Sequence, residues 1–181
     1  MSEVVESNFR HIRELARSID ARLDHDNATD RRIRNELAGM FAVTIVATYE
    51  SIVRETLVEY AGRFHPKYQS HVEGDFAKMN AKISLDNLKS YSNQFGLSPW
   101  REAGAPKNGS GTTFHKLLKE KREVVERRFR KDLAQSYSNL FRWRNDYAHE
   151  RSATTTFNEV YEAHRVAQYV VRTFVKAFEK G

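Results

Sequence analysis

The chain has 181 residues, with 30 Lys and Arg against 24 Asp and Glu, and it contains no Cys. This length suits one domain with a single core, and the lack of Cys excludes disulfides, thiolate metal sites and Cys nucleophiles. The first 25 residues are interrupted by charges, and the longest nearly uncharged apolar run, Leu37 to Tyr49, covers only 13 residues. Neither a signal peptide nor a membrane span is therefore expected. We expect one soluble domain over residues 1–181, located in the cytoplasm.

The net charge of +6 comes from one stretch of the chain. Between residues 116 and 144 there are ten basic and four acidic side chains, whereas the charges cancel in residues 1–115 and 145–181. A concentrated basic stretch attracts polyanions such as RNA through phosphate contacts and counterion release. The alternative is a solvated helix face that carries Glu–Arg pairs four residues apart, such as Glu123 and Arg127.

Apolar residues recur with the 3.6-residue period of α-helices along most of the chain, and no convincing two-residue period occurs. In chain order the pattern predicts helices over about 4–24 and 31–64, one or two shorter helices over 76–95, one or two over 114–147, and a last helix over 157–178. The apolar stripe of the second helix drifts around its axis, which predicts different neighbours at its two ends. The fold class is therefore all-α, an up-down bundle of about four main helices with shorter helices and a loop-rich insertion.

Turn and cap signals separate these helices. Pro66 is expected to stop the second helix, and Ser84 is expected to cap a shorter helix further on. The stretch 96–112 holds four of the eight Gly and two of the three Pro, which predicts a flexible loop within the domain. Thr156 and Glu159 form a capping-box pattern in front of the last helix.

The residues best suited to chemistry lie between Phe141 and Arg151, in the order Phe-Arg-Trp-Arg-Asn-Asp-Tyr-Ala-His-Glu-Arg. Arg144 and His149 are five residues apart, which is about 140° around an ideal helix. Their side chains can act at one site if the helix is distorted there, or if two copies of the chain meet across a symmetric interface. In the first case, Asn145 would hold a turn by hydrogen bonding its own backbone.

The Arg144-Asn145-x-x-x-His149 motif, placed before a final amphipathic helix, resembles that of the HEPN superfamily (higher eukaryotes and prokaryotes nucleotide-binding), and more narrowly its RiboL-PSP and MAE-type branches. The order of elements is similar over most of residues 30–181. The resemblance implies a metal-independent endoribonuclease of the toxin or antiphage-defence kind, whose homodimer lines one cleft with two motifs. It further implies that His149 is the acid or base, Arg144 the cation that stabilises the transition state, and Asn145 the residue that orients the motif.

These residue types suit RNA cleavage, in which a 2′-OH attacks the neighbouring phosphorus and leaves a 2′,3′-cyclic phosphate and a 5′-OH. An imidazole with an ordinary pKa of about 6.5 can transfer either proton at neutral pH. A guanidinium can bind two phosphoryl oxygens as negative charge builds. No cofactor is expected. The seven His residues form no HxxxH or HExxH pair, so no metal site is expected either.

Four flanking residues are candidates for RNA binding. Arg142 and Arg151 would contact phosphates, and Trp143 and Tyr147 would stack on bases, although aromatic residues in a bundle are more often core. Family members that are regulated by tyrosine nucleotidylation carry a Tyr two residues after the His, where this chain has Arg151. That mechanism is therefore not expected here, while an antitoxin or another regulatory protein stays open as a further partner.

The sequence leaves two classes of function open. The first is the homodimeric HEPN ribonuclease. The second is a non-catalytic helical HEPN scaffold that binds RNA or a partner protein, in which Arg144 closes a salt bridge and His149 caps the C-terminus of its helix. His164, on the apolar stripe of the last helix, is expected to line the bundle rather than to act as a second catalytic group.

Overall fold

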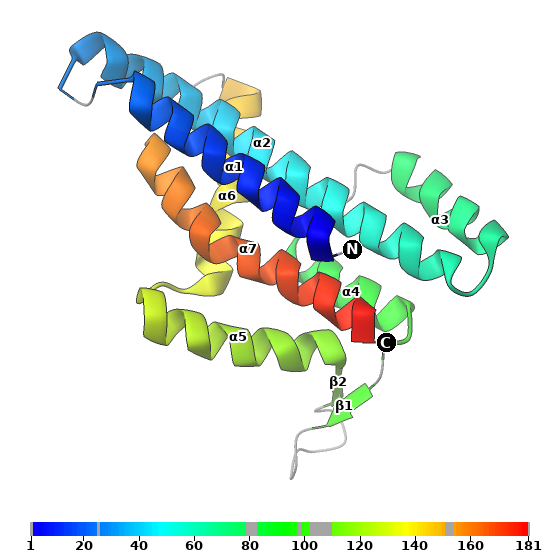
Figure 1. The fold of residues 1–181 in the computed structure, drawn as a ribbon. Helices are drawn as coiled ribbons and strands as arrows, with labels where there is room; N and C mark the ends of the chain where they lie inside the picture. The colour runs from blue at the N-terminus through cyan, green and yellow to red at the C-terminus, as the bar shows by residue number, and fades with distance from the viewer. Residues whose placement is uncertain are drawn as a thin grey trace. The chain divides into compact units, whose positions relative to one another are not determined.

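The computed structural model describes residues 2–24, 26–78, 83–97, 99–101, 110–150 and 154–180. This part of the chain forms seven helices and one pair of short strands (Figure 1). In chain order they are α1 (Ser2–Arg22), α2 (Ala28–Gly62), α3 (Pro66–Lys78), α4 (Leu85–Gln94), β1 (Pro99–Arg101), β2 (Ser110–Thr112), α5 (Thr113–Phe129), α6 (Leu133–Glu150) and α7 (Phe157–Lys180). The predicted all-α class is confirmed.

The helices belong to two compact units. One, here called the motif unit, comprises Ser2–Thr48 and Lys131–Gln168, and the other, the hairpin unit, comprises Tyr49–Arg130 and Tyr169–Gly181. Because α2 passes from the first unit to the second at Tyr49, its two ends have different neighbours, as the drifting stripe predicts. That residues 1–181 form a single domain stays a prediction. Both α2 and α7 contribute residues to each of the two units.

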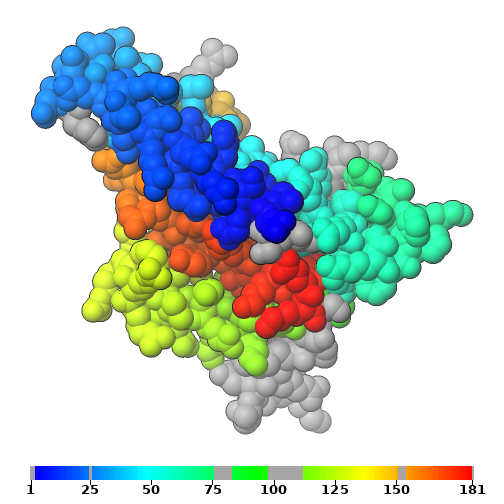
Figure 2. All heavy atoms as spheres, in the orientation of Figure 1, coloured from blue at the N-terminus to red at the C-terminus, as the bar shows by residue number. Residues whose placement is uncertain are grey.

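The motif unit is built from four helical segments: α1, the first part of α2, α6 and the first part of α7. Figure 1 shows α1 running beside the first part of α2, and Figure 2 shows the same pair as closely packed spheres. Phe41 of α2 stacks on Phe157 of α7 with a centroid distance of 4.8 Å. Phe9 of α1 meets His164 of α7 edge-on at 5.7 Å. The apolar stripe of α7 thus packs against both N-terminal helices.

His164 is fully buried in this core, as expected for a residue that lines the bundle. Burial, together with the positive charge of Arg13, lowers the pKa of His164 from 6.5 to about 3. The ring is therefore neutral in the folded protein down to acid pH, whereas in the unfolded chain it takes up a proton below about pH 6.5.

Acid is expected to destabilise the protein through His164. The stability that its neutral ring contributes is fully present above pH 6.5 and is lost as the pH falls toward 3, because only the unfolded state binds the proton. Between pH 6.5 and pH 4.5 the thermal unfolding midpoint of His164→Leu should therefore fall less than that of the wild type. The exposed His11 of the same unit provides the control, since His11→Ala should follow the wild type. Equal slopes for all three proteins would contradict the prediction.

The hairpin unit has an aromatic core at the ends of three helices. The rings of Tyr60, Phe95 and Phe178 lie within 5.1–6.0 Å of one another, centroid to centroid. Ser84 caps α4 as predicted, because its hydroxyl accepts a hydrogen bond from the backbone of Asn87. Gly96, with φ of +65°, follows α4 in the left-handed conformation that glycine adopts without strain.

The predicted loop over 96–112 differs from the structure at its two ends. There β1 and β2 pair as antiparallel strands, with Trp100 opposite Gly111. Each strand has only three residues, too few to show a two-residue period in the sequence. The middle of the predicted loop, residues 102–109, lies outside the described residues.

Helix boundaries differ from the prediction in two places. The shorter helices predicted over 76–95 are α3, which begins ten residues earlier at Pro66, and α4. α2 already ends at Gly62, and Pro66, expected to stop it, is instead the first residue of α3. Proline suits this position because the first turn of a helix leaves its N–H groups unbonded. The segment 114–147 contains two helices, separated where Arg130 adopts a left-handed φ of +54°.

Among the described helices, α2 is long and apolar enough to cross a membrane, judged by length and composition alone. Half of its most apolar stretch is buried inside the protein, and a core helix passes the same test.

Candidate active site

The whole Arg-Asn-x-x-x-His motif lies on α6, which runs unbroken from Leu133 to Glu150. The carboxylate of Asp132 accepts the backbone N–H of Gln135 at 2.8 Å and so caps the start of this helix. Of the two predicted ways to bring Arg144 and His149 to one site, a turn or distortion of the helix is therefore excluded, and convergence across a symmetric interface stays a prediction. In a continuous helix the two side chains leave the axis about 140° apart.

The side chain of Asn145 forms a hydrogen bond with the side chain of Arg144 and does not stabilise a backbone turn. Its Oδ1 accepts a hydrogen bond from Nη1 of Arg144 at 3.0 Å. Arg144 is half-buried, whereas Asn145 is exposed. The amide therefore fixes the guanidinium of its neighbour at the boundary between core and solvent.

Three residues of the candidate site share one exposed face of α6. Arg142, Asn145 and His149 are all exposed, and they follow one another at spacings of three and four. We call this set the motif face. It unites two predicted catalytic residues with Arg142, a predicted RNA-binding residue, while Arg151 lies outside the described residues.

The two aromatic candidates lie on another side of α6. Trp143 is only 8% exposed and lines a groove of about 460 Å³ between α6 and α7. Tyr147 is half-buried and packs on Gly39 of α2 so closely that a Cβ at Gly39 would lie 2.0 Å from its Cδ2. Stacking of these rings on RNA bases stays a prediction, and in this structure both rings pack between helices.

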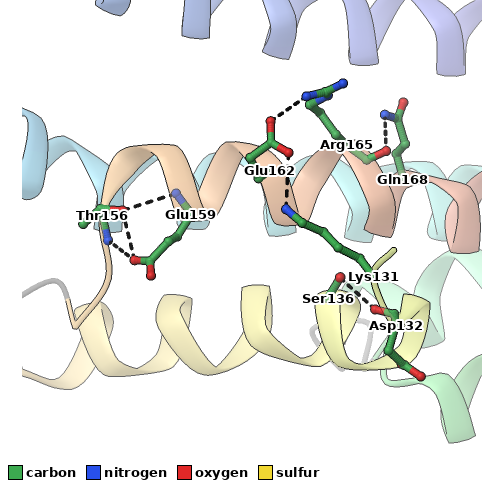
Figure 3. A network of polar contacts seen from close by, with 8 residues as sticks. All are labelled: Lys131, Asp132, Ser136, Thr156, Glu159, Glu162, Arg165 and Gln168. Carbon is green, nitrogen blue, oxygen red and sulfur yellow. Dashed lines mark hydrogen bonds and ion pairs between the residues drawn. The ribbon is translucent and has the colours of Figure 1, made fainter. Parts of the chain in front are cut away.

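The groove beside Trp143 is bordered by an ordered polar network (Figure 3). The carboxylate of Glu162 binds Nζ of Lys131 at 3.3 Å and Nη1 of Arg165 at 2.6 Å. Burial raises the pKa of Glu162, but the hydrogen bonds and charges of Arg165 and Lys131 outweigh burial and hold this pKa below its ordinary value. The sequence did not reveal this groove because its walls come from α6 and α7, and neither helix alone defines it.

The connection from α6 to α7 is fixed at both of its described ends. Oγ1 of Thr154 donates to the carboxylate of Asp146 at 2.8 Å. The predicted capping box is confirmed: Glu159 accepts the backbone N–H of Thr156 at 2.8 Å, and Oγ1 of Thr156 accepts the N–H of Glu159 at 3.3 Å (Figure 3). The pKa of Glu159 is lowered because its carboxylate accepts hydrogen bonds from the backbone N–H of Thr156 first, and then from the hydroxyls of Thr156 and Thr155.

Replacing Thr156 by Ala should destabilise the protein by about 1 kcal/mol at neutral pH, because α7 loses its N-cap. The loss should shrink as the pH falls through the lowered pKa of Glu159, since a protonated Glu159 no longer holds the box. Urea unfolding at pH 7 and at about pH 3 measures both values. Thr29→Ala, on an exposed residue whose side chain forms no cap, provides the control. A loss that is the same at both pH values would contradict this account of the cap.

Among the described residues, no group of three or more His, Asp and Glu side chains is placed to hold a metal ion.

An all-α chain that carries Arg-Asn-x-x-x-His at the exposed end of one helix, directly before the last helix, has the features of a HEPN domain. Comparison with known protein families matches residues 6–180 to the RiboL-PSP-HEPN domain. The chain therefore belongs to the RiboL-PSP-HEPN family, and the resemblance drawn from Arg144, Asn145 and His149 is confirmed. HEPN domains are typically ribonucleases and generally act on RNA. No curated protein and no solved structure matches the chain.

Proposed function

We propose that the protein is a metal-independent endoribonuclease that cleaves RNA at a site formed between two identical subunits. The observation that carries this proposal is the position of the motif: Asn145 and His149 are exposed on an unbroken helix, and Asn145 holds the guanidinium of Arg144. An exposed imidazole can transfer one of the protons that move in phosphodiester cleavage, and an oriented guanidinium can stabilise the charge that builds on the phosphoryl oxygens.

The reaction follows from these two groups. The 2′-OH of one nucleotide attacks the adjacent phosphorus and gives up its proton to a base. The bond from phosphorus to the 5′ oxygen then breaks, and the leaving oxygen takes a proton from an acid. His149 serves as one of these proton-transfer groups, and Arg144 binds the phosphoryl oxygens as charge builds on them. The products are a 2′,3′-cyclic phosphate and a 5′-OH.

A homodimer would bring Arg144 and His149 together. Two copies of α6 that face each other across a two-fold axis would place Arg144 of one subunit near His149 of the partner subunit. Exposed apolar residues on α2 favour such an interface, with Met40 53% and Val43 36% exposed. They are close in sequence to Gly39, where α2 contacts α6.

RNA as the substrate is supported by the basic stretch. The exposed side chains of α5 include five cations, Lys116, Lys119, Arg122, Arg127 and Arg128. Such a helix attracts the RNA backbone at a distance and adds phosphate contacts.

We further propose that this activity serves a toxin or antiphage-defence system in the cytoplasm, where an antitoxin or another regulatory protein restrains it. The family assignment supports this role. The exposed apolar residues of α2 also favour the alternative function, a non-catalytic HEPN scaffold that binds RNA or a partner protein.

The decisive experiment incubates the purified protein with single-stranded RNA in EDTA and identifies the product ends. Cleavage to 2′,3′-cyclic phosphates by the wild type, but not by His149→Ala, is the expected result. Light scattering of both proteins should give the mass of a dimer. RNA that is bound but stays intact in EDTA, and after Mg²⁺ is restored, would favour the scaffold.

A further inference from the structure

The motif unit has a second pocket, and no residue of the motif face lines it. Its volume is about 220 Å³, and six residues line it: Arg31, Arg34 and Asn35 of α2, with Thr156, Phe157 and Asn158 at the start of α7. Two of these side chains are cationic and none is a carboxylate. The first turns of α2, which supply the arginines, lie at the surface of the molecule (Figure 2).

The inner wall of the pocket is rigid because Arg34 is fixed on three sides. Arg34 is 5% exposed, and its Nη1 pairs with the carboxylate of Asp20 at 2.7 Å. Its Nη2 donates to Oδ1 of Asn158 at 3.0 Å, and its guanidinium lies 5.2 Å from the ring centroid of Phe157. Arg34 therefore links α1, α2 and α7, and its charge is partly neutralised by Asp20.

The outer wall of the pocket carries Arg31, which unlike Arg34 is exposed to solvent. Arg31 is exposed, and within the described part of the chain its side chain makes no hydrogen bond or ion pair. Its neighbour Arg32 instead pairs with Glu36 at 3.8 Å and does not line the pocket. The two adjacent arginines of α2 therefore differ in their surroundings. Of the two, only Arg31 lines the pocket, and its charge is not paired with a carboxylate within the described part of the chain.

We propose that this pocket binds a phosphate group of the RNA backbone, at a position other than the cleaved bond. A guanidinium binds two phosphate oxygens at once, and the amide of Asn35 supplies a further donor. The assignment of the phosphate to RNA rests on the proposed ribonuclease function.

The pocket is connected to the motif by a short path within the same unit. Thr156 lines the pocket two residues after Thr154, whose hydroxyl is bonded to Asp146. Asp146 lies three residues before His149 on α6, roughly 4.5 Å along the axis. A phosphate held by Arg31 would therefore position the RNA strand relative to the motif face. Arg31 is a binding residue in this proposal and takes no part in proton transfer.

The test compares Arg31→Ala with Arg32→Ala. Each variant removes one exposed arginine from the same helix, so both change the net charge equally. The binding of a 2′-O-methyl oligonucleotide, which cannot be cleaved, is measured as a function of salt concentration. Arg31→Ala should weaken binding several-fold and reduce the salt slope by roughly 0.7, the value for one phosphate contact on a single strand. With cleavable RNA, Arg31→Ala should raise KM by a larger factor than it lowers kcat.

A second variant tests the pocket without removing an arginine. Asn35→Asp keeps the shape of an exposed side chain but places a carboxylate against the phosphate, so it should weaken binding at least as much as Arg31→Ala. Unfolding midpoints that match the wild type will exclude a loss of fold. If Arg31→Ala and Arg32→Ala bind alike while the wild type cleaves RNA, the pocket proposal is overturned and the ribonuclease proposal stands. A wild type that neither binds nor cleaves RNA would overturn both.

Discussion

His149→Ala is expected to slow RNA cleavage on the order of 10²–10⁴-fold, because the reaction loses a group that moves a proton in the transition state. Arg144→Ala should cause a loss of similar size, since the phosphorane loses its counter-charge. The exposed position of His149 makes this substitution harmless to the fold. Single-turnover cleavage of labelled RNA in EDTA measures the rates, and unfolding midpoints show that the variants are folded.

The matched control for His149→Ala is His11→Ala, which removes another exposed histidine from the same unit. It should leave the rate of cleavage unchanged. Wild-type rates in both His149→Ala and Arg144→Ala would rule out the proposed mechanism, whatever the RNA affinity of the protein.

A mixture of the two inactive variants tests whether the site is shared between subunits. The mixed dimer combines Arg144 of the His149→Ala subunit with His149 of the Arg144→Ala subunit. If the two residues act across the interface, one of its two sites is intact, and an equal mixture should recover up to about a quarter of the wild-type activity. If each site lies within one chain, mixing restores nothing. The unbroken α6 favours recovery, because its two motif side chains point about 140° apart.

Sequence periodicity predicted the helices well where one face is buried along the whole length. α7 shows this, since its apolar stripe and the capping box at Thr156 and Glu159 mark its start within one residue. The strands β1 and β2 were not predicted. They contact α4 and α5, and the sequence of these short Gly- and Pro-rich segments does not reveal such contacts.

The candidate site was predictable in its residues but not in its geometry. Arg144, Asn145 and His149 are recognisable by type and spacing, yet Asn145 suggests a turn as readily as a helix. In the structure the helix continues through Asn145, whose Oδ1 accepts a hydrogen bond from the guanidinium of Arg144. The pocket beside Arg31 could not be predicted from the sequence, since it joins residues of α2 to Asn158, more than 120 positions away.

Gly39→Ala is expected to destabilise the protein by about 1–3 kcal/mol, although Ala favours helices over Gly. The added Cβ would lie 2.0 Å from Cδ2 and 2.3 Å from Cγ of Tyr147, so the ring or the helix that carries it must move. Because Tyr147 lies two residues before His149, cleavage should weaken as well. Urea unfolding measures the first effect and single-turnover kinetics the second. Gly74→Ala in α3 is the control, since a Cβ there meets nothing within 4 Å and should stabilise the protein by about 0.5–1 kcal/mol.

A double-mutant cycle separates steric conflict from any other cost of changing Gly39. Tyr147→Ala alone should destabilise the protein, because it empties the space between α2 and α6. In that background Gly39→Ala no longer meets a ring, so it should be neutral or slightly stabilising, and the two substitutions should be strongly non-additive. If Gly39→Ala costs the same with and without the ring, the close approach of Tyr147 is not the reason for glycine at this position. Non-additivity in stability together with a loss of cleavage in both single variants would show that the contact between Gly39 and Tyr147 also sets the position of the motif face.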